Sequence, residues 1–368
     1  VMIRNFVLIF LLSSNYLYSS TDNYYLYVAS ESDDVVSLLR FDGKEIKEIE
    51  RIDVGIMPTE IEGPHGITVD PSGDFWYLSL AHGSPFGSLV KYSTETNKAL
   101  SKTNLGLFPA SMQVSPSTGL LYCVNFNLHG DMKPSTVSVV DPELMVEIKQ
   151  ITTGSMPHGS RLSPDGLFQY SVAMMSGELF EIDAISLEVT RKLDLDKKMD
   201  HSSMNHSSMD HSSHNMMNSM KHSKVKPTWV IPHPSENTAY VAGNGSNEII
   251  EVNLDDWSIT NRFKTGKGPY NVEITPNGKY LVVTIKGEGS TSIFDLVNKK
   301  MVSNLKNSTN VSHGIALSPD NKYAFISVEG VGGEPGVVDV INLETLKLIS
   351  SVNVGKQAGG IAFWKISD

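Results

Sequence analysis

The stretch Pro64-His65-Gly66-Ile67-Thr68-Val69-Asp70-Pro71-Ser72-Gly73 decides the fold, because its pattern returns at intervals along the chain. Each copy joins a small-residue opening to an apolar β-rich run and then to a proline turn. Strong copies begin at Pro157-His158-Gly159, Pro269-Tyr270-Asn271 and Ser312-His313-Gly314. Weaker copies begin at Pro109-Ala110 and Pro227-Thr228, and a truncated copy, Ala358 to Phe363, closes the chain. A repeat of this kind predicts an array of similar structural units.

Each unit is predicted to hold four short strands. A β-rich run follows each proline turn, as in Phe75 to Leu80 or Tyr280 to Ile285, and two further runs follow, as in Gly336 to Ile341 and Leu346 to Val354. No 3.6-residue apolar period lasts long enough to indicate a helix. Four strands separated by Pro, Gly, Asp and Asn turns are typical of a propeller blade.

The chain length predicts the number of blades. Residues 21–368 number 348, and without an insertion of 28 residues at 197–224 they number 320, or about 46 for each of seven repeats. The predicted fold class is therefore all-β, with one seven-bladed propeller domain over 21–368. The run Tyr25 to Arg40 lacks an innermost strand, and Gly360 to Trp364 lacks a blade of its own. We expect these two segments to share one blade and close the ring, which removes free strand edges.

Two repeats carry a family resemblance. Tyr240-Val241-Ala242 followed by Ile249-Ile250-Glu251-Val252-Asn253 resembles the YVTN-type β-propeller repeat, and so does Leu121-Tyr122-Cys123-Val124-Asn125 followed by Val137 to Asp141. The resemblance covers nearly all of residues 21–368 and implies a seven-bladed propeller of a commonly exported kind. It says little about function, because this fold hosts surface proteins, lactonases and metalloenzymes.

Residues 1–20 have the pattern of a secretory signal peptide. Arg4 precedes the apolar run Phe6 to Leu12, and polar and small residues continue to Ser20. The run is too short to cross a bilayer, so we expect export to the periplasm or cell exterior and no membrane span. A net charge of −11 argues against a nucleic-acid partner. The single cysteine, Cys123, excludes an intrachain disulfide.

Histidine recurs at one position of the repeat. The residue six places before the proline of each turn is expected to open the innermost strand at the mouth of the central channel, and it is histidine in three of seven repeats: His65, His158 and His313. Loops predicted on the same face add Met57, His82, His129, Met132, Met156, Met174, Met175 and Glu329. An alternative is that Pro-His-Gly is only a turn copied with the repeat. His233 precedes a proline turn on the opposite face, and we interpret it as structural.

The insertion between blades 4 and 5 is rich in methionine and histidine. It holds six of the 15 methionines and five of the 11 histidines in the chain: Met199, His201, Met204, His206, Met209, His211, His214, Met216, Met217, Met220 and His222. The segment has no aromatic residues, and we expect it to be disordered without a ligand. Thioether sulfur suits Cu(I), and imidazole suits Cu(II), Zn(II) and Ni(II). The segment resembles the Met/His-rich segments of exported copper-handling proteins, so the sequence predicts copper as the bound metal. A polar linker is the alternative.

The sequence therefore favours an exported copper-binding propeller that captures, stores or delivers the metal with this segment and the histidines of the hub. The expected partners are the metal ion and another exported copper-handling protein, and the chain is expected to be a monomer. One alternative is a copper-dependent oxidoreductase, because the histidine-lined mouth resembles that of nitrous oxide reductase. That family needs many more hub histidines and a cupredoxin domain, both absent here. The other alternative is a metal-free scaffold or a lactonase-like hydrolase, for which Glu329 and Glu334 are candidate carboxylates. A binding role is preferred over catalysis.

Overall fold

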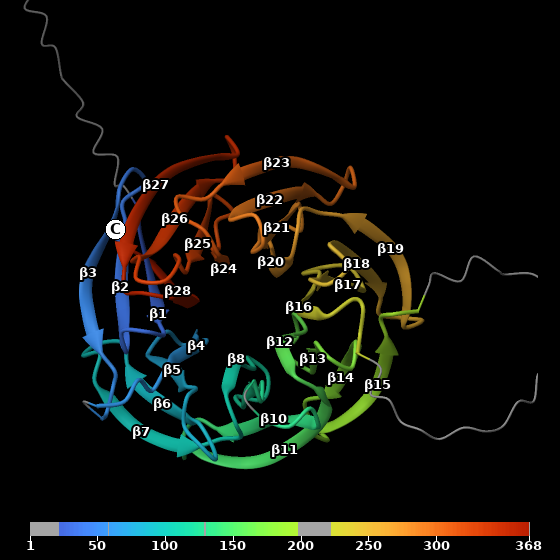
Figure 1. The fold of residues 1–368 in the computed structure, drawn as a ribbon, viewed down its shortest axis with the longest axis horizontal. Coiled ribbons are helices and arrows are strands. Elements are labelled where there is room, and N and C mark those ends of the chain that lie inside the picture. The colour runs from blue at the N-terminus through green and yellow to red at the C-terminus, as the bar shows by residue number, and fades with distance from the viewer. Residues whose placement is uncertain (1–21, 58, 129, 198–221, 368) are drawn as a thin grey trace, which may run out of the picture.

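The structure, a computed structural model, describes residues 22–57, 59–128, 130–197 and 222–367. These residues form seven four-stranded antiparallel sheets arranged as a ring, a seven-bladed β-propeller (Figure 1). The predicted fold class is confirmed. The predicted signal peptide, residues 1–20, lies outside the described residues.

Each blade runs outward from the central channel. Blade 1 consists of β28 (Ala358–Ser367), β1 (Asn23–Ser30), β2 (Val35–Phe41) and β3 (Ile46–Asp53). Blade 2 consists of β4 (Pro64–Val69), β5 (Phe75–Leu80), β6 (Ser88–Ser93) and β7 (Ala99–Asn104). Blade 3 consists of β8 (Pro109–Val114), β9 (Leu121–Asn125), β10 (Pro134–Asp141) and β11 (Val146–Ser155). Blade 4 consists of β12 (Pro157–Leu162), β13 (Phe168–Ala173), β14 (Glu178–Asp183) and β15 (Glu188–Asp194).

The remaining three blades repeat this order. Blade 5 consists of β16 (Pro227–Pro232), β17 (Thr238–Gly243), β18 (Glu248–Asn253) and β19 (Ser258–Lys264). Blade 6 consists of β20 (Pro269–Ile274), β21 (Tyr280–Ile285), β22 (Ser290–Asp295) and β23 (Lys300–Lys306). Blade 7 consists of β24 (Ser312–Leu317), β25 (Tyr323–Val328), β26 (Gly336–Asn342) and β27 (Lys347–Val354).

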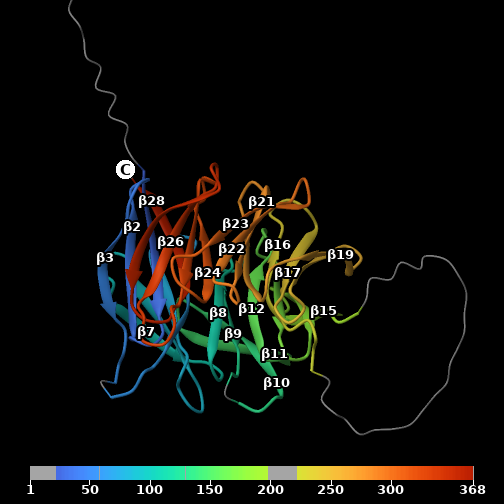
Figure 2. The ribbon, with the colours of Figure 1, turned by 45° about the horizontal axis from the view of Figure 1, so that its top comes forward.

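The two ends of the described chain close the ring within blade 1. Strand β28 pairs with β1 in antiparallel register, with Leu26 opposite Phe363 and Tyr27 opposite Ala362. Figure 2, turned by 45° from Figure 1, shows β28 in the same blade as β2 and β3. The predicted pairing of the terminal segments is confirmed. Closure matters because it pairs the backbone groups that an open ring would leave on exposed strand edges.

The glycine of each Pro/Ser-His-Gly turn allows the innermost strands to approach one another. A Cβ atom on Gly66 would lie 1.7 Å from the carbonyl oxygen of Ala110 on blade 3. The corresponding contacts are 2.4 Å from Gly159 to the Thr228 oxygen and 2.6 Å from Gly314 to the Gly359 oxygen. Only glycine fits such close backbone contact. The packing of the hub therefore explains the glycine in this motif without explaining the histidine before it.

Candidate functional site

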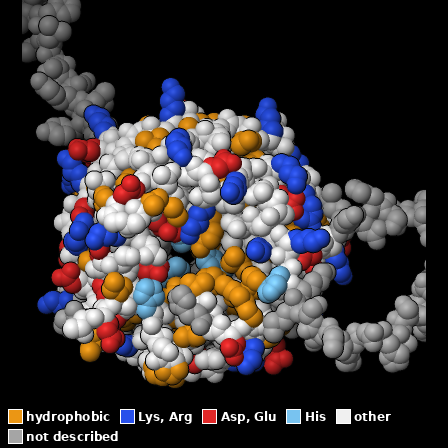
Figure 3. Space-filling view, in the orientation of Figure 1, with side chains coloured by type: hydrophobic (Ala, Val, Ile, Leu, Met, Phe, Trp, Pro, Cys, Tyr) orange, Lys and Arg blue, Asp and Glu red, His pale blue; other side chains and the backbone are white. Residues whose placement is uncertain are grey.

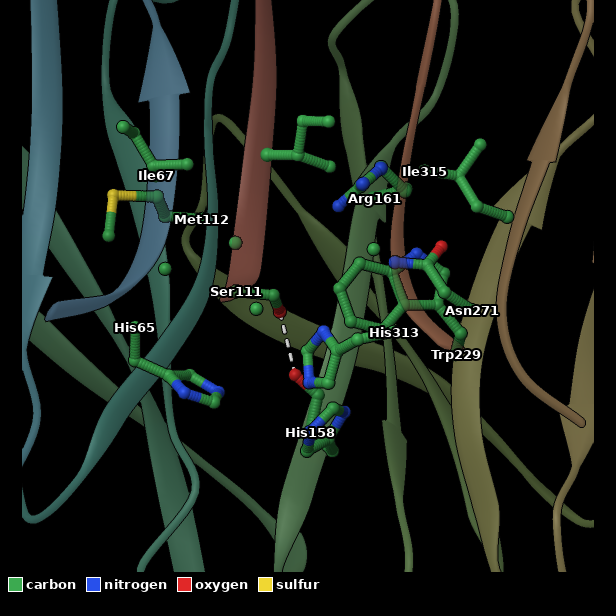
Figure 4. Close-up of a pocket in the computed structure, with 15 residues that line it drawn as sticks. His65, Ile67, Ser111, Met112, His158, Arg161, Trp229, Asn271, His313 and Ile315 are labelled. Atoms are coloured by element: carbon green, nitrogen blue, oxygen red, sulfur yellow. Dashed lines mark hydrogen bonds between the residues drawn. The ribbon is translucent and has the colours of Figure 1, made fainter. Parts of the chain in front are cut away.

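Three histidines from three blades meet at one mouth of the central channel. His65 lies on β4, His158 on β12 and His313 on β24, and all three line one small cavity of about 40 Å³ (Figure 4). The centre of the His65 ring lies 6.5 Å from that of His158 and 5.9 Å from that of His313. On the same face, Figure 3 shows histidine in the wall of the central opening and apolar side chains around it. The repeat thus brings together the three histidines that the sequence predicted.

His65 is held by a carboxylate that the sequence did not predict. Glu31, in the turn after β1, is buried and bonds to His65 Nδ1 at 2.7 Å and to His82 Nε2 at 2.9 Å. Burial raises the pKa of Glu31, but the two imidazoles outweigh burial and the net pKa lies below its usual value. The bond to Glu31 in turn raises the pKa of His82. Because Nδ1 of His65 bonds the Glu31 carboxylate, Nε2 on the opposite side of the ring is the nitrogen that can bind a ligand in the channel.

His158 is buried in an aromatic setting at the base of the mouth. Its Nδ1 lies 3.0 Å from the carbonyl oxygen of Thr228, which can only accept, so Nδ1 carries the proton. Its Nε2 lone pair therefore accepts the hydroxyl of Tyr270 at 2.7 Å. Burial, followed by the neighbouring His65 and Lys286, lowers the pKa of His158 to about 3. His158 is consequently a neutral imidazole at physiological pH.

His313 completes the cluster and faces a charged pair. Its Nε2 lies 3.7 Å from Glu329 Oε1, and that oxygen bonds Lys286 Nζ at 2.7 Å. The lysine lies 4.2 Å from the centre of the Tyr270 ring. Burial, then the charge of Lys286, lowers the pKa of His313. Among the atoms that the structure describes, His313 Nδ1 is buried without a hydrogen-bond partner, and such an unpaired nitrogen is costly unless a ligand uses it.

An ion pair lies deeper in the channel. Arg161 Nε donates to Glu273 Oε1 at 2.8 Å, and the guanidinium lies 4.8 Å from the ring centre of Trp229. Burial raises the pKa of Glu273 despite the opposing effect of Arg161. Figure 4 shows Arg161 and the three histidines on different levels of the channel. The pair separates the histidine mouth from the opposite mouth of the propeller.

The other candidate residues have separate positions. His82 lies at the rim and reaches the cluster through Glu31. His222 is exposed, and His233 accepts the backbone amides of Ser235 and Glu236 in its turn, which agrees with the structural interpretation. The following candidates lie outside the described residues: His129, Met199, His201, Met204, His206, Met209, His211, His214, Met216, Met217 and Met220.

The described residues contain no group of three or more His, Cys, Asp or Glu side chains placed to hold a metal ion. The bond between Tyr270 and His158 gives one reason, because it occupies the nitrogen that would face a metal. The orientation of two histidines nonetheless resembles that of metal ligands. His65 and His158 each use Nδ1 for a hydrogen bond, to Glu31 and to the Thr228 carbonyl oxygen, so that Nε2 points away from that partner. Imidazoles sharing one ion at about 2.0–2.1 Å with bond angles of about 110–120° have ring centres about 5–5.5 Å apart, so the rings at 5.9 and 6.5 Å would have to move closer to share an ion. Within the described residues no helix has the length and apolar character to cross a membrane.

The sequence prediction missed Glu31 and Lys286. Both stand directly after the second strand of a blade, a position that forms a second ring above the histidines. That position could have been found by applying the repeat register to the second strand as well as to the first. Around the propeller this ring reads Glu31, Ala81, Phe126, Met174, Asn244, Lys286 and Glu329. Charged residues therefore occupy blades 6, 7 and 1, and apolar or sulfur-bearing residues occupy blades 2, 3 and 4.

Comparison with known proteins supports the fold alone. No protein-family model and no curated protein matches the chain, so the resemblance to YVTN-type repeats stays a prediction. Among solved structures, hydrazine synthase from Kuenenia stuttgartiensis is 20% identical with a TM-score of 0.64, covering 84% of this chain and 92% of that one. The periplasmic gluconolactonase of Pseudomonas aeruginosa is 14% identical with a TM-score of 0.67, covering 94% and 100%. A functionally unknown protein from Desulfotomaculum acetoxidans is 16% identical with a TM-score of 0.67, covering 92% and 98%.

Proposed function

We propose that the chain is an exported copper-binding propeller, in which the histidines of the hub hold one ion and the Met/His-rich insertion captures more. The observation that carries this proposal is the convergence of His65, His158 and His313 with their separations of 5.9 and 6.5 Å. His65 and His158 are oriented through Nδ1, as metal-binding histidines are. When bound there, copper would add a Lewis-acidic, redox-active centre to the mouth.

The insertion supports copper in preference to zinc or nickel. Imidazole binds all three metals, whereas thioether sulfur favours Cu(I). Six methionines among 28 residues are unusual for a polar linker, in which serine repeats would suffice. Thioether is also the soft donor that tolerates an oxidising compartment better than thiolate does. Export itself is part of the proposal and rests on residues 1–20.

The attachment of the insertion lies on the histidine face. Asp196 Oδ1 accepts the backbone amides of Lys224 and Val225, both at 3.0 Å, and so holds the two described ends together. The amide of Ser223 donates to the carbonyl oxygen of Met175 at 3.0 Å. Met175 belongs to the turn after β13, beside the mouth. The described ends of the insertion therefore lie on the side of the propeller where the histidines lie.

The test is the metal content of protein purified from the exported compartment of its source. We expect copper, with more than one ion per chain. A full-length variant in which the methionines and histidines of 199–222 become serine and asparagine should lose most Cu(I). The double variant His65→Gln/His313→Gln should lose at most one tighter ion. His233→Gln, on the opposite face, is the matched control and should lose none. Unchanged copper in both altered proteins would contradict the proposal.

A lactone hydrolase is a second candidate because one contact favours it. The hydroxyl of Tyr270 lies 2.7 Å from a neutral His158, with Lys286 over the phenol ring, an acid–base arrangement of the kind used in hydrolysis. One of the similar structures is a periplasmic gluconolactonase, at 14% identity. Hydrolysis of sugar lactones by metal-free protein, lost in Tyr270→Phe, would favour this candidate. If the metal-free protein does not hydrolyse sugar lactones, copper binding remains the better-supported function.

A further inference from the structure

Three methionines gather beside the mouth on the blade 4 side. Met156 precedes β12, and Met174 and Met175 follow β13. The amide of Met174 donates to the carbonyl oxygen of Met156 at 2.8 Å, so the two turns are joined. The three side chains pack in one small cluster with Phe108 and Phe126. This methionine cluster belongs to the folded propeller and is separate from the insertion.

The backbone does not explain the choice of methionine in this cluster. Met156 has a left-handed φ of 53°, and the same position of other blades holds glycine, phenylalanine, lysine, valine or glutamine, so the backbone there does not select methionine. Met174 and Met175 are only half-buried, at a turn where blades 1 and 7 place glutamates. Methionine packs well against aromatic rings such as those of Phe108 and Phe126, and three neighbouring thioethers in addition offer soft ligands.

The cluster lies between the insertion and the histidines. On one side, Ser223 at the described end of the insertion bonds the backbone of Met175. On the other side, Phe126 packs on the cluster and its ring centre lies 4.7 Å from that of His158. The methionine cluster therefore contacts both the described attachment of the insertion and the aromatic wall of the histidine site.

We propose that Met156, Met174 and Met175 form a binding site for one soft monovalent ion, Cu(I), distinct from both the insertion and the histidines. The proposal rests on the proposed function only for the identity of the ion. Thioethers are neutral and carry no proton in this range, so binding needs no deprotonation and no redox step. The site would hold copper in its reduced state on the route to the hub.

The test uses Ag(I), a soft ion that does not change oxidation state, and the full-length chain with the methionines and histidines of 199–222 replaced by serine and asparagine. After desalting, we expect one Ag(I) per chain with sulfur neighbours in X-ray absorption. Met156→Leu/Met174→Leu/Met175→Leu should lose that ion. Met145→Leu, buried elsewhere, and Met301→Leu, exposed, should keep it. His65→Gln/His313→Gln should also keep it, so a failure of the hub copper site would not be mistaken for a failure of this one.

A second measurement does not depend on the folding of the triple variant. Peroxide oxidation of Met174 and Met175, followed by mass spectrometry, should slow at least tenfold with one equivalent of Ag(I), while oxidation of Met301 should not change. Silver bound only by nitrogen, equal silver in the triple leucine variant when it is folded, or no protection from peroxide would each overturn the proposal.

Discussion

Lowering the pH should destabilise the propeller through its buried hub histidines. His158 is 1% exposed, and burial with nearby positive charge lowers its pKa to about 3. An unfolded histidine titrates near pH 6.5. Because the folded state binds fewer protons than the unfolded state between these values, the contribution of His158 is fully present above about pH 6.5. It is lost as the pH falls toward the folded pKa.

The size of the effect follows from the two pKa values. Between pH 7 and pH 4.5 the unfolded histidine becomes almost fully protonated and the folded one does not. Linkage then removes about 2.5 kcal/mol from the free energy of unfolding for His158 alone. His313 should act in the same direction, because burial and Lys286 lower its pKa too.

The assay is urea unfolding of the metal-free protein at pH 7 and pH 4.5, with His158→Asn beside the parent. His158→Asn should lower the free energy of unfolding by about 2.5 kcal/mol less at pH 4.5 than at pH 7. The reason is that the variant has no imidazole whose protonation favours the unfolded state. His82→Asn is the matched control of opposite sign. The pKa of His82 is raised by Glu31, so its contribution is present below about pH 6.5 and is lost as the pH rises. An equal cost of His158→Asn at both pH values would refute the assignment of His158 as a neutral, buried imidazole.

Three further predictions concern the frame that holds the site. Gly66→Ala should cost about 3 kcal/mol in thermal or urea unfolding, because its Cβ would meet the Ala110 oxygen, whereas Gly333→Ala, with open space around it, should change stability by less than about 0.5 kcal/mol. Arg161→Met should cost about 1–3 kcal/mol by leaving the partly buried Glu273 without its partner, and Glu273→Leu added to it should recover most of that loss. Removing β28 should abolish cooperative unfolding followed by circular dichroism, because blade 1 then lacks its innermost strand. A cooperative transition in that truncated chain would contradict the closure.

The fold could be predicted because every blade uses the same proline turn. The predicted runs Phe75 to Leu80 and Tyr280 to Ile285 coincide with β5 and β21. Register propagates through the repeat, so a single well-marked turn places four strands. The pairing of β1 with β28 could be predicted as well, since each terminal segment alone is an incomplete blade.

The site could be predicted only where the repeat register identifies equivalent positions. That register placed His65, His158 and His313 on one face, but it could not show which neighbouring side chains meet. Glu31 lies 34 residues before His65, on the neighbouring blade, and contacts it only when blades 1 and 2 pack together. The bond between His158 and Tyr270 crosses 112 residues and two blades. Such contacts depend on blade geometry, which the pattern of one strand does not contain.

In the shared motif, packing requires the glycine and does not require the histidine, and this difference bears directly on function. Close backbone contact at the hub requires the glycine in blades 2, 4 and 7, as the Ala110, Thr228 and Gly359 oxygens show. The preceding position carries no such requirement, because other blades fill it with alanine, threonine, tyrosine or glycine. A turn copied for packing alone would therefore need its glycine and not its histidine. Three histidines at that unconstrained position, meeting at one channel mouth with a carboxylate behind one and an unpaired nitrogen on another, favour selection for a ligand.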